Sequence, residues 1–196
     1  MNTLLFTTTN QGKMQEMRAL FEGSKVQLLM PNALGIQLDV AESGETYAEN
    51  AALKARAWAA ASGLPTLADD SGLEVEHLDW QPGVQSARFH PKKGATDAER
   101  RTYLLQLLQA FPQPWAARFV CVLCLAQPNG EVDYSRGECP GIIITEERGE
   151  NGFGYDPIFY IPELGKTMAE LSMEEKNRIS HRARATHHKW TKMISL

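Results

Sequence analysis

Acidic side chains that could hold a metal ion or activate water gather where a predicted strand ends. Asp69 and Asp70 follow the apolar run of residues 64–68, and Glu42 and Glu49 lie earlier in the chain. Carboxylates in this position can project into a cleft, and carboxylate oxygens are the ligands that Mg2+ prefers. A carboxylate beside such an ion can also orient or deprotonate an attacking water. Paired aspartates that only cap a turn are the alternative interpretation of the same residues.

A polar loop with the sequence TTTNQGK, residues 7–13, lies between a predicted strand at residues 4–8 and a predicted helix at residues 13–22. Backbone amides at a helix N-terminus, with hydroxyls and a lysine nearby, suit a phosphate group. The loop is not a Walker A motif, because the G-x-x-x-x-G-K-[ST] spacing is missing and Met14 follows Lys13. An ordinary turn with a surface lysine is the alternative.

Two aromatic residues separated by a glycine occur in the segment GFGYDP, residues 152–157. Phe153 and Tyr155 could stack on a flat base, and Asp156 could bind the edge of that base through hydrogen bonds. A tight turn with two core aromatic residues explains the segment equally well.

The fourth cluster lies on a predicted final helix. Lys176 and Ser180 are four residues apart and share a face of that helix, so Lys176 could reach a phosphate. His181 and Arg182 could donate hydrogen bonds to an oxygen on a base. A solvated helix of mixed charge is the alternative.

The elements that must position these clusters are predicted by local patterns. Capping-box spacing predicts the starts of three helices, at Thr46 with Glu49, at Thr96 with Glu99 and at Ser172 with Glu175. The first of these helices runs to about Ser62, where Gly63 stops it. The second has a predicted core stripe of Leu104, Leu107, Leu108 and Phe111.

Strand signals occupy the second half of the chain. Residues 119–126 are apolar on both faces and predict a central strand. The Pro128-Asn129-Gly130 turn predicts a hairpin into residues 131–138, and residues 142–144 predict another short strand. Alternating strands and helices with one hairpin predict an α/β protein with a mixed β-sheet and flanking helices.

The 196-residue chain has an ordinary globular composition, with 43% hydrophobic and 22% charged residues. This length suits one domain, residues 1–196, folded as two lobes around a cleft. The formal net charge of −4 gives no general attraction to nucleic acid or acidic lipid, so an anionic ligand needs a local basic cluster. The sequence has no repeat, and we expect neither a signal peptide nor a membrane span, because no basic region precedes a long apolar run and no run reaches about 18 apolar residues.

Three cysteines make an odd number, which argues against a secreted scaffold held by disulfides. Cys121 and Cys124 have the spacing of a redox or zinc pair, but both lie in the predicted strand at residues 119–126. Residues three apart on a strand point to opposite faces, so two core cysteines are favoured. A reducing, cytoplasmic location fits this pattern.

Taken in order, the four clusters resemble the inosine triphosphate pyrophosphatase family, also called the Ham1-like family. The matching segments are TTTNQGK at 7–13, ETYAENAALKA at 45–55, ADDSGL at 68–73, PGVQSARF at 82–89, GFGYDP at 152–157, KTMAEL at 166–171 and SHR at 180–182. Each segment alone is modestly specific, whereas the ordered set is highly specific and covers nearly the whole chain. The resemblance therefore favours the catalytic interpretation of each cluster over its alternative.

The resemblance implies an elongated α/β fold, with two lobes around a substrate cleft, that forms a homodimer. It also implies Mg2+-assisted attack of water on ITP, dITP or XTP, between the α and β phosphates. The products would be the nucleoside monophosphate and pyrophosphate, and the cellular role would be cleansing of the nucleotide pool.

The resemblance assigns roles to individual residues. The first loop would contact the triphosphate through Thr8, Thr9, Asn10, Gln11, Gly12 and Lys13. Lys54 would reach the phosphates from its helix, Glu42 and Asp70 would hold Mg2+, and Asp70 would also activate the water. Ser71 would bind substrate. The base and sugar would lie between Phe153, Gly154, Tyr155 and Asp156, with further base and phosphate contacts from Lys176, His181 and Arg182.

One position departs from the family pattern. Thr9 stands where a glycine usually precedes the asparagine of the first loop, and its side chain can alter the approach of a phosphate. The departure leaves the class of enzyme intact and puts relative substrate affinities in doubt.

Three other functions compete with this one. A pyrophosphatase for pyrimidine or modified nucleotides would use the same chemistry. A nucleic-acid-binding module could use the basic residues of the last helix, but the net charge of −4 and the carboxylate cluster count against it. Those basic residues are Lys176, Arg178, Arg182, Arg184, Lys189 and Lys192. A nucleotide sensor without activity would need a broken acidic site, yet Glu42, Asp69 and Asp70 are all present.

Overall fold

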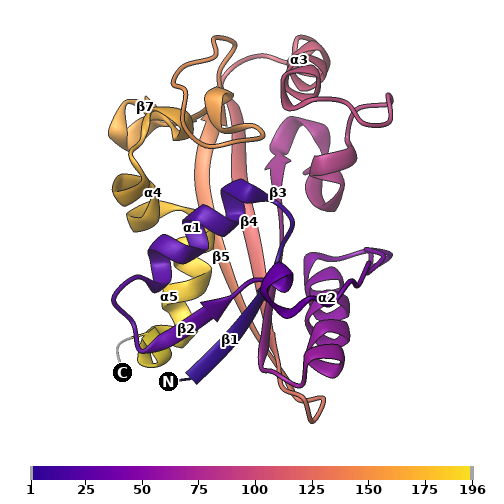
Figure 1. The fold of residues 1–196 in the computed structure, drawn as a ribbon. Coiled ribbons are helices and arrows are strands. Elements are labelled where there is room, and N and C mark those ends of the chain that lie inside the picture. Colours follow the sequence, from indigo (N-terminus) through magenta and orange to yellow (C-terminus); the bar gives the residue numbers. More distant parts are fainter. Residues whose placement is uncertain (1, 195–196) are drawn as a thin grey trace. The chain divides into compact units, whose positions relative to one another are not determined.

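The computed structural model describes the backbone of residues 2–194 and the side chains of residues 3–187, so the side chains of Lys189 and Lys192 lie outside the described part. The chain forms two compact units, whose helices and strands are labelled in Figure 1. The first unit consists of residues up to Asp70, Cys121–Gly137 and residues from His181 onward, and the second of Ser71–Val120 and Glu138–Ser180. The single domain of residues 1–196, with a cleft between two lobes, stays a prediction.

The described strands form a mixed seven-stranded sheet in the order β2-β1-β3-β4-β5-β6-β7, as the sequence predicts for the fold class. Their bounds are β1 Asn2–Thr7, β2 Val26–Leu29, β3 Thr66–Val75, β4 Trp115–Ala126, β5 Val132–Ile143, β6 Phe159–Ile161 and β7 Lys166–Thr167. Strand β1 pairs in parallel with β2 and β3, whereas β6 pairs antiparallel with β5 and β7. Strand β4 lies in the middle of the order, which confirms the predicted central strand.

The α-helices are α1 Gln11–Phe21, α2 Tyr47–Ser62, α3 Asp97–Leu108, α4 Met173–Ile179 and α5 His181–Ile194. Short 3-10 helices are η1 Pro31–Leu34, η2 Glu76–Leu78, η3 Gly83–Arg88, η4 Asp156–Ile158, η5 Pro162–Leu164 and η6 Met168–Glu170. Within the described residues, every helix is too short or too polar to cross a lipid bilayer.

The core of the first unit lies on both faces of its strands. On one face, Leu67 and Cys121 pack with residues of α1 and α5, which lie side by side in Figure 1. On the other face, Ala68 and Cys124 pack with alanines of α2. Because successive strand residues point to opposite faces, the two cysteines occupy different parts of the core, as predicted. Burial raises the pKa of Cys121 to about 12 and that of Cys124 to about 11, so both are neutral thiols.

Local sequence signals explain why α2 begins and ends where it does. The Thr46 side chain accepts a hydrogen bond from the Glu49 amide, and the Glu49 carboxylate accepts one from the Thr46 amide. This capping box satisfies amides that have no partner inside the helix. Gly63 then adopts a left-handed conformation, with φ of 69°, that ends the helix as predicted.

A close approach joins β5 to the first turn of α5 in the first unit. A Cβ atom at Gly137 would lie 2.2 Å from the carbonyl oxygen of His181 and 2.3 Å from the amide nitrogen of Ala185. Only glycine allows the two backbones to lie this close. Ser135 adds a hydrogen bond of 2.6 Å, which its hydroxyl donates to the Ala185 carbonyl.

The second unit has its own core, formed by one cluster around β3, β4 and β5 that includes Leu104, Leu108, Phe119 and Phe159. The predicted stripe of α3 is correct for Leu104 and Leu108, which are buried. It is wrong for Phe111, which lies beyond the end of α3 and is 36% exposed.

Two predicted strands have different bounds in the structure. The strand predicted to stop at Ala68 continues through Asp69, Asp70 and Ser71 to Val75. Likewise, residues 142 and 143 belong to the long strand β5 rather than to a separate short strand. Burial with charged partners, described below, allows polar residues to continue β3.

The predicted final helix is wrong as a single helix. Helix α4 ends at Ile179, and Ser180 has an extended backbone whose amide donates to the Lys176 carbonyl at 2.8 Å. A second helix, α5, begins at His181. Lys176 therefore belongs to the second unit, whereas His181 and Arg182 belong to the first.

Candidate active site

Asp69 is a buried carboxylate among cations in the first unit. Its Oδ2 atom lies 2.9 Å from Lys13 Nζ and 3.0 Å from an Arg182 guanidinium nitrogen. Burial alone would raise the pKa of Asp69, but the charges of Lys13, Arg182 and Lys54 hold it well below its usual range. Asp69 is therefore ionised at any physiological pH, and it holds the cations in place.

Arg182 is fully buried at the start of α5, where it also forms an ion pair with Glu16 of α1. Burial lowers the pKa of Arg182, but Glu16 and Asp69 raise it above the ordinary value, so the guanidinium stays charged. Glu16 was not predicted from the sequence, although its place beside Met17, on a helix that enters the core, is a weak signal.

Asp70, the next residue of β3, has a different environment. It is 6% exposed and accepts a hydrogen bond of 3.1 Å from the side-chain amide of Asn50. Burial raises the pKa of Asp70, against the opposing effects of Lys54 and Lys13. Adjacent carboxylates with oppositely shifted pKa values are a common arrangement where one is a fixed charge and the other accepts a proton.

Lys54 connects α2 to the segment that precedes it. Its Nζ atom donates to Glu42 Oε1 at 2.6 Å and to the Asp69 carbonyl at 2.6 Å. Burial lowers the pKa of Lys54, but Asp69, Glu42 and Asp70 together raise it, so the amine stays protonated. The structure thus brings together four residues that the sequence predicts for one site: Lys13, Glu42, Lys54 and Asp70.

The predicted phosphate loop lies at the N-terminus of α1, in the same unit. Asn10 caps this helix by accepting a hydrogen bond of 3.0 Å from the Lys13 amide. The Thr8 hydroxyl accepts one of 3.1 Å from the Asn10 amide. Thr9, Asn10 and Gln11 are exposed, while Lys13 points back to Asp69. A helix N-terminus with an adjacent lysine carries positive charge that favours an anion.

The second unit holds the predicted base-binding segment. Asp156 and Lys176 form a buried ion pair of 2.6 Å, and Lys176 Nζ lies 5.2 Å from the centre of the Phe153 ring. Asp156 also accepts a hydrogen bond of 2.9 Å from the Phe153 amide. Phe153 is half-buried, as is Ser71, the first residue of this unit.

Helix α3 holds the rest of that segment. The Gly154 amide donates to Asp97 at 2.7 Å, and Arg101 donates to the Gly154 carbonyl at 2.8 Å. The structure places Tyr155 in the hydrophobic core, where its hydroxyl donates to the Ser86 carbonyl at 2.9 Å. Asp97 and Arg101 were not predicted from the sequence, because contacts between residues 57 and 53 positions apart leave no local pattern.

Glu42 and Asp70 suit Mg2+ but not a metal that needs all of its ligands from protein side chains. Among the described residues, no group of three or more histidine, cysteine, aspartate or glutamate side chains is arranged around a metal position. Mg2+ is commonly bound by one or two carboxylates together with substrate phosphates and water. The donor set of the first unit fits that pattern.

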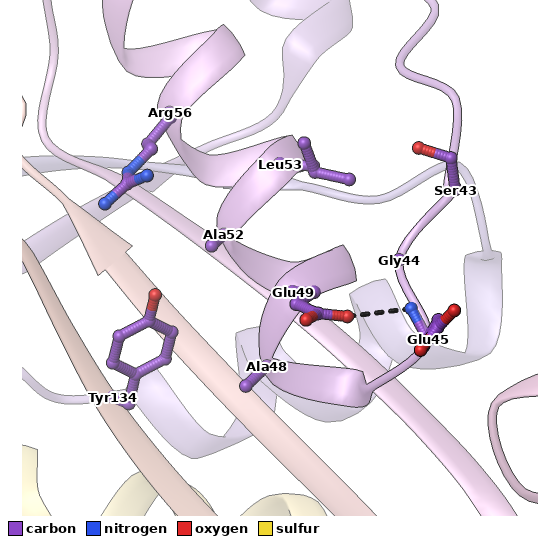
Figure 2. A pocket seen from close by; sticks show the side chains of 9 residues that line it. All are labelled: Ser43, Gly44, Glu45, Ala48, Glu49, Ala52, Leu53, Arg56 and Tyr134. Atoms are coloured by element: carbon purple, nitrogen blue, oxygen red, sulfur yellow. Dashed lines mark hydrogen bonds between the residues drawn. The ribbon is translucent and has the colours of Figure 1, made fainter.

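A pocket of about 560 Å3 lies on α2 and the segment before it, and Glu49 is the residue of the predicted acidic cluster that lines it (Figure 2). Figure 2 shows Glu49 accepting a hydrogen bond from the Glu45 amide at one side of this pocket. The lining residues are Ser43, Gly44, Glu45, Ala48, Glu49, Ala52, Leu53, Arg56 and Tyr134.

Comparisons with known proteins give one consistent result. The model of the Ham1 family matches residues 4–190. A dITP/XTP pyrophosphatase of Desulforamulus reducens is 46% identical over 185 residues, which cover 93% of this chain and 90% of that protein. A dITP/XTP pyrophosphatase of Deinococcus deserti is 48% identical, with 93% and 85% covered.

Solved structures agree with the sequence comparisons. The structure of a HAM1 protein from Coxiella burnetii has a TM-score of 0.89 and 40% identity, and 100% of both chains is covered. A nucleoside-triphosphatase / dITP/XTP pyrophosphatase from Mycobacterium abscessus has a TM-score of 0.74 and 38% identity, with 95% of this chain and 97% of that chain covered.

Proposed function

Because this chain belongs to the Ham1 family, we propose that it hydrolyses dITP, ITP and XTP to the nucleoside monophosphate and pyrophosphate. The curated relatives that support this proposal are dITP/XTP pyrophosphatases at 46% to 48% identity over most of their length. Such an enzyme removes purine nucleotides with an abnormal base from the nucleotide pool.

The contrast between Asp69 and Asp70 is the observation that carries the proposal. Asp69 is ionised and fixes Lys13 and Arg182, whereas Asp70 accepts a hydrogen bond from the side-chain amide of Asn50. A carboxylate positioned beside cations can accept the proton of an attacking water. Cations beside an acceptor of this kind suit a reaction in which water attacks a phosphate.

In the proposed reaction, the oxygen of water forms a bond to the α-phosphorus and Asp70 takes the proton of that water. The bond from the α-phosphorus to the oxygen that bridges to the β-phosphorus breaks, and pyrophosphate leaves with both electrons of that bond. Lys13 and Lys54, which are both charged neighbours of Asp69, offset the negative charge of the phosphates. The protein itself forms no covalent intermediate.

Mg2+ is the proposed cofactor, held by Glu42 and Asp70, and it would polarise the phosphate when bound. The first-loop residues Thr8, Thr9, Asn10, Gln11 and Gly12 would bind the triphosphate with Lys13. Ser71, Phe153, Gly154, Tyr155, Asp156 and Lys176 are proposed to bind and orient the substrate. The core position of Tyr155 supports a role in holding the Phe153 loop rather than one in stacking.

Selection of the base is proposed to depend on position 6. Hypoxanthine and xanthine carry an oxygen there, whereas adenine carries an amino group. His181 and Arg182 would donate hydrogen bonds to the oxygen, and both are buried at the start of α5. A donor that faces the amino group of adenine would lose its partner, at a cost of about 1–3 kcal/mol.

We also propose that the protein is a cytoplasmic homodimer that binds neither nucleic acid nor membranes. The family resemblance supports the dimer. The three cysteines are buried and outside any disulfide, which suits a reducing compartment. Light scattering coupled to size-exclusion chromatography measures the mass directly, and a mass near 21.8 kDa would exclude the dimer.

The decisive experiment measures pyrophosphate release from dITP, ITP, XTP, GTP, ATP and dUTP, with and without Mg2+. We expect fast release that requires Mg2+ and is confined to dITP, ITP and XTP. Equal rates with ATP or faster release from dUTP would overturn the proposed substrate class. Rates that do not change when Mg2+ is removed would overturn the proposed cofactor.

A further inference from the structure

Asn50 of α2 is a buried side chain of the first unit to which the reaction above assigns no role. It is 1% exposed. A buried amide needs partners for both its oxygen and its nitrogen, because an unpaired polar group inside a protein is costly. The identity of the two Asn50 partners therefore indicates what this residue does.

One end of the Asn50 amide holds Asp70. Asn50 Nδ2 donates to Asp70 Oδ2 at 3.1 Å, and Asp70 is the proposed proton acceptor. A carboxylate can rotate about its terminal bond, and a buried donor on one oxygen restricts that rotation. The other oxygen then keeps a defined direction.

The other end of the amide holds the segment that carries Glu42. Asn50 Oδ1 accepts a hydrogen bond of 2.8 Å from the Gly44 amide. The next two amides, of Glu45 and Thr46, donate to Glu49 Oε2 at 2.7 and 3.0 Å. Three successive amides are thus fastened to the first turn of α2, and Figure 2 shows the bond between Glu45 and Glu49.

Gly44 makes this arrangement possible. A Cβ atom at position 44 would lie 2.6 Å from Glu49 Cβ and 2.9 Å from Asn50 Oδ1, closer than real Cβ atoms approach. The segment must therefore lie directly against the two side chains that hold it. A side chain at Gly44 would therefore force the segment away from Glu49 and from the Asn50 amide.

We propose that Asn50 is a positioning residue that sets Asp70 and the Glu42 segment relative to each other. This inference rests on the proposed function, in which Asp70 and Glu42 together hold Mg2+. Asn50 does not touch the reacting atoms in this scheme, and it acts only through Asp70 and the backbone of Gly44. Loss of a residue that orients a metal ligand without contacting the metal commonly lowers metal affinity or activity by about 10- to 100-fold.

The test compares Asn50→Ala and Gly44→Ala with the wild type. The first removes both hydrogen bonds, and the second leaves Asn50 in the chain but forces the Gly44 segment away from its amide. Two quantities are measured: kcat and KM for dITP, and the affinity for Mn2+ by electron paramagnetic resonance. The Mn2+ titration includes the α,β-methylene analogue of dITP, so it requires no turnover.

Ser135→Ala is the matched control, because it also removes a buried hydrogen bond in the first unit, at 2.6 Å to the Ala185 carbonyl. We expect both test variants to lower kcat and Mn2+ affinity by about 10- to 100-fold, with KM within about threefold. Ser135→Ala should lower the unfolding midpoint and leave kcat and Mn2+ affinity within about twofold.

Several outcomes overturn the inference. One is unchanged kcat and Mn2+ affinity in both test variants. Another is a fall in kcat and Mn2+ affinity in Ser135→Ala as large as in the test variants, with the same fall in the unfolding midpoint. That result would indicate a general effect of reduced stability. If Asn50→Ala does not fold, the kcat and Mn2+ affinity of Gly44→Ala alone decide whether the inference holds. In a further outcome, the wild type releases no pyrophosphate while both test variants still bind Mn2+ more weakly than it does. That result would refute the proposed function and leave the positioning role intact.

Discussion

Asp69 and Asp70 are adjacent in β3, yet their surroundings shift their pKa values in opposite directions. The side chains of consecutive strand residues point to opposite faces, so neighbours in sequence can enter different environments. Asp69 meets Lys13 and Arg182, whereas Asp70 meets the Asn50 amide. The division of labour proposed for the two carboxylates follows from this alternation.

Asp70→Asn keeps the size of the side chain and removes its ability to accept a proton. We expect turnover of dITP to fall by about 100-fold or more, because a positioned base commonly contributes that much. Thermal unfolding should change little. Asp79→Asn, at an exposed turn with φ of 50° where asparagine is well tolerated, is the control and should keep full activity. Near-normal turnover in Asp70→Asn would remove Asp70 from the mechanism.

Arg182→Ala tests the buried ion network. The substitution leaves Glu16 and Asp69 as buried carboxylates without the cation they share, so we expect a loss of about 3–5 kcal/mol in the free energy of unfolding. Urea unfolding with fluorescence detection measures this loss. Arg178→Ala, which breaks an exposed ion pair with Glu174, should leave the midpoint unchanged. Similar losses of unfolding free energy in Arg182→Ala and Arg178→Ala would contradict the claim that the buried ion pairs of Arg182 stabilise the protein more than an exposed pair does.

The residue types of the site could be predicted from the sequence, but their partners could not. Asp69, Asp70 and Lys13 stand in recognisable local motifs. Glu16 and Asn50 do not, because their importance comes from contacts with Arg182 and Asp70 that lie 166 and 20 residues away. Buried polar partners of this kind are determined by the fold.

Elements that depend on local signals agree well with the sequence. The capping boxes at Thr46, Thr96 and Ser172 begin α2, α3 and α4 as predicted, since each is a contact between residues three apart. The break at Ser180 was not predicted. No glycine or proline stands at Ser180 to indicate its extended backbone, and the residues on both sides are helical. The continuation of β3 through Asp69 and Asp70 was missed for a related reason, since cations from distant helices stabilise those carboxylates in the strand.

The approach of β5 to α5 gives a prediction about elements. Gly137→Ala places a methyl group within 2.3 Å of the α5 backbone, where no side chain can move aside. We expect a loss of about 1–3 kcal/mol in the free energy of unfolding, as in other overpacked sites. Glu131→Ala, at an exposed position before the same strand, is the control. Unchanged stability in Gly137→Ala would mean that strand and helix separate at little cost.

For the molecule as a whole, thiol reactivity reports on unfolding. Cys121, Cys124 and Cys139 are buried and outside any disulfide. Burial raises the pKa of Cys121 to about 12 and that of Cys124 to about 11, so these two thiols are neutral near pH 8. Burial also keeps all three thiols out of reach of a disulfide reagent. We expect no reaction of the native protein with Ellman's reagent, and reaction of all three in guanidinium chloride. A thiol that reacts at once in the native protein would show that its part of the core opens readily.

The distribution of the two units along the chain has a consequence for protein synthesis. Residues of the second unit end at Ser180, while the first unit requires residues from His181 onward. Arg182, the cation that Glu16 and Asp69 share, is therefore made 113 residues after Asp69. A nascent chain has made both carboxylates long before it makes this partner, so the buried ion pairs of the first unit can form only after Arg182 has left the ribosome. A chain released early, before codon 182, would lack the cation that Glu16 and Asp69 share, and it would be a natural target for proteolysis.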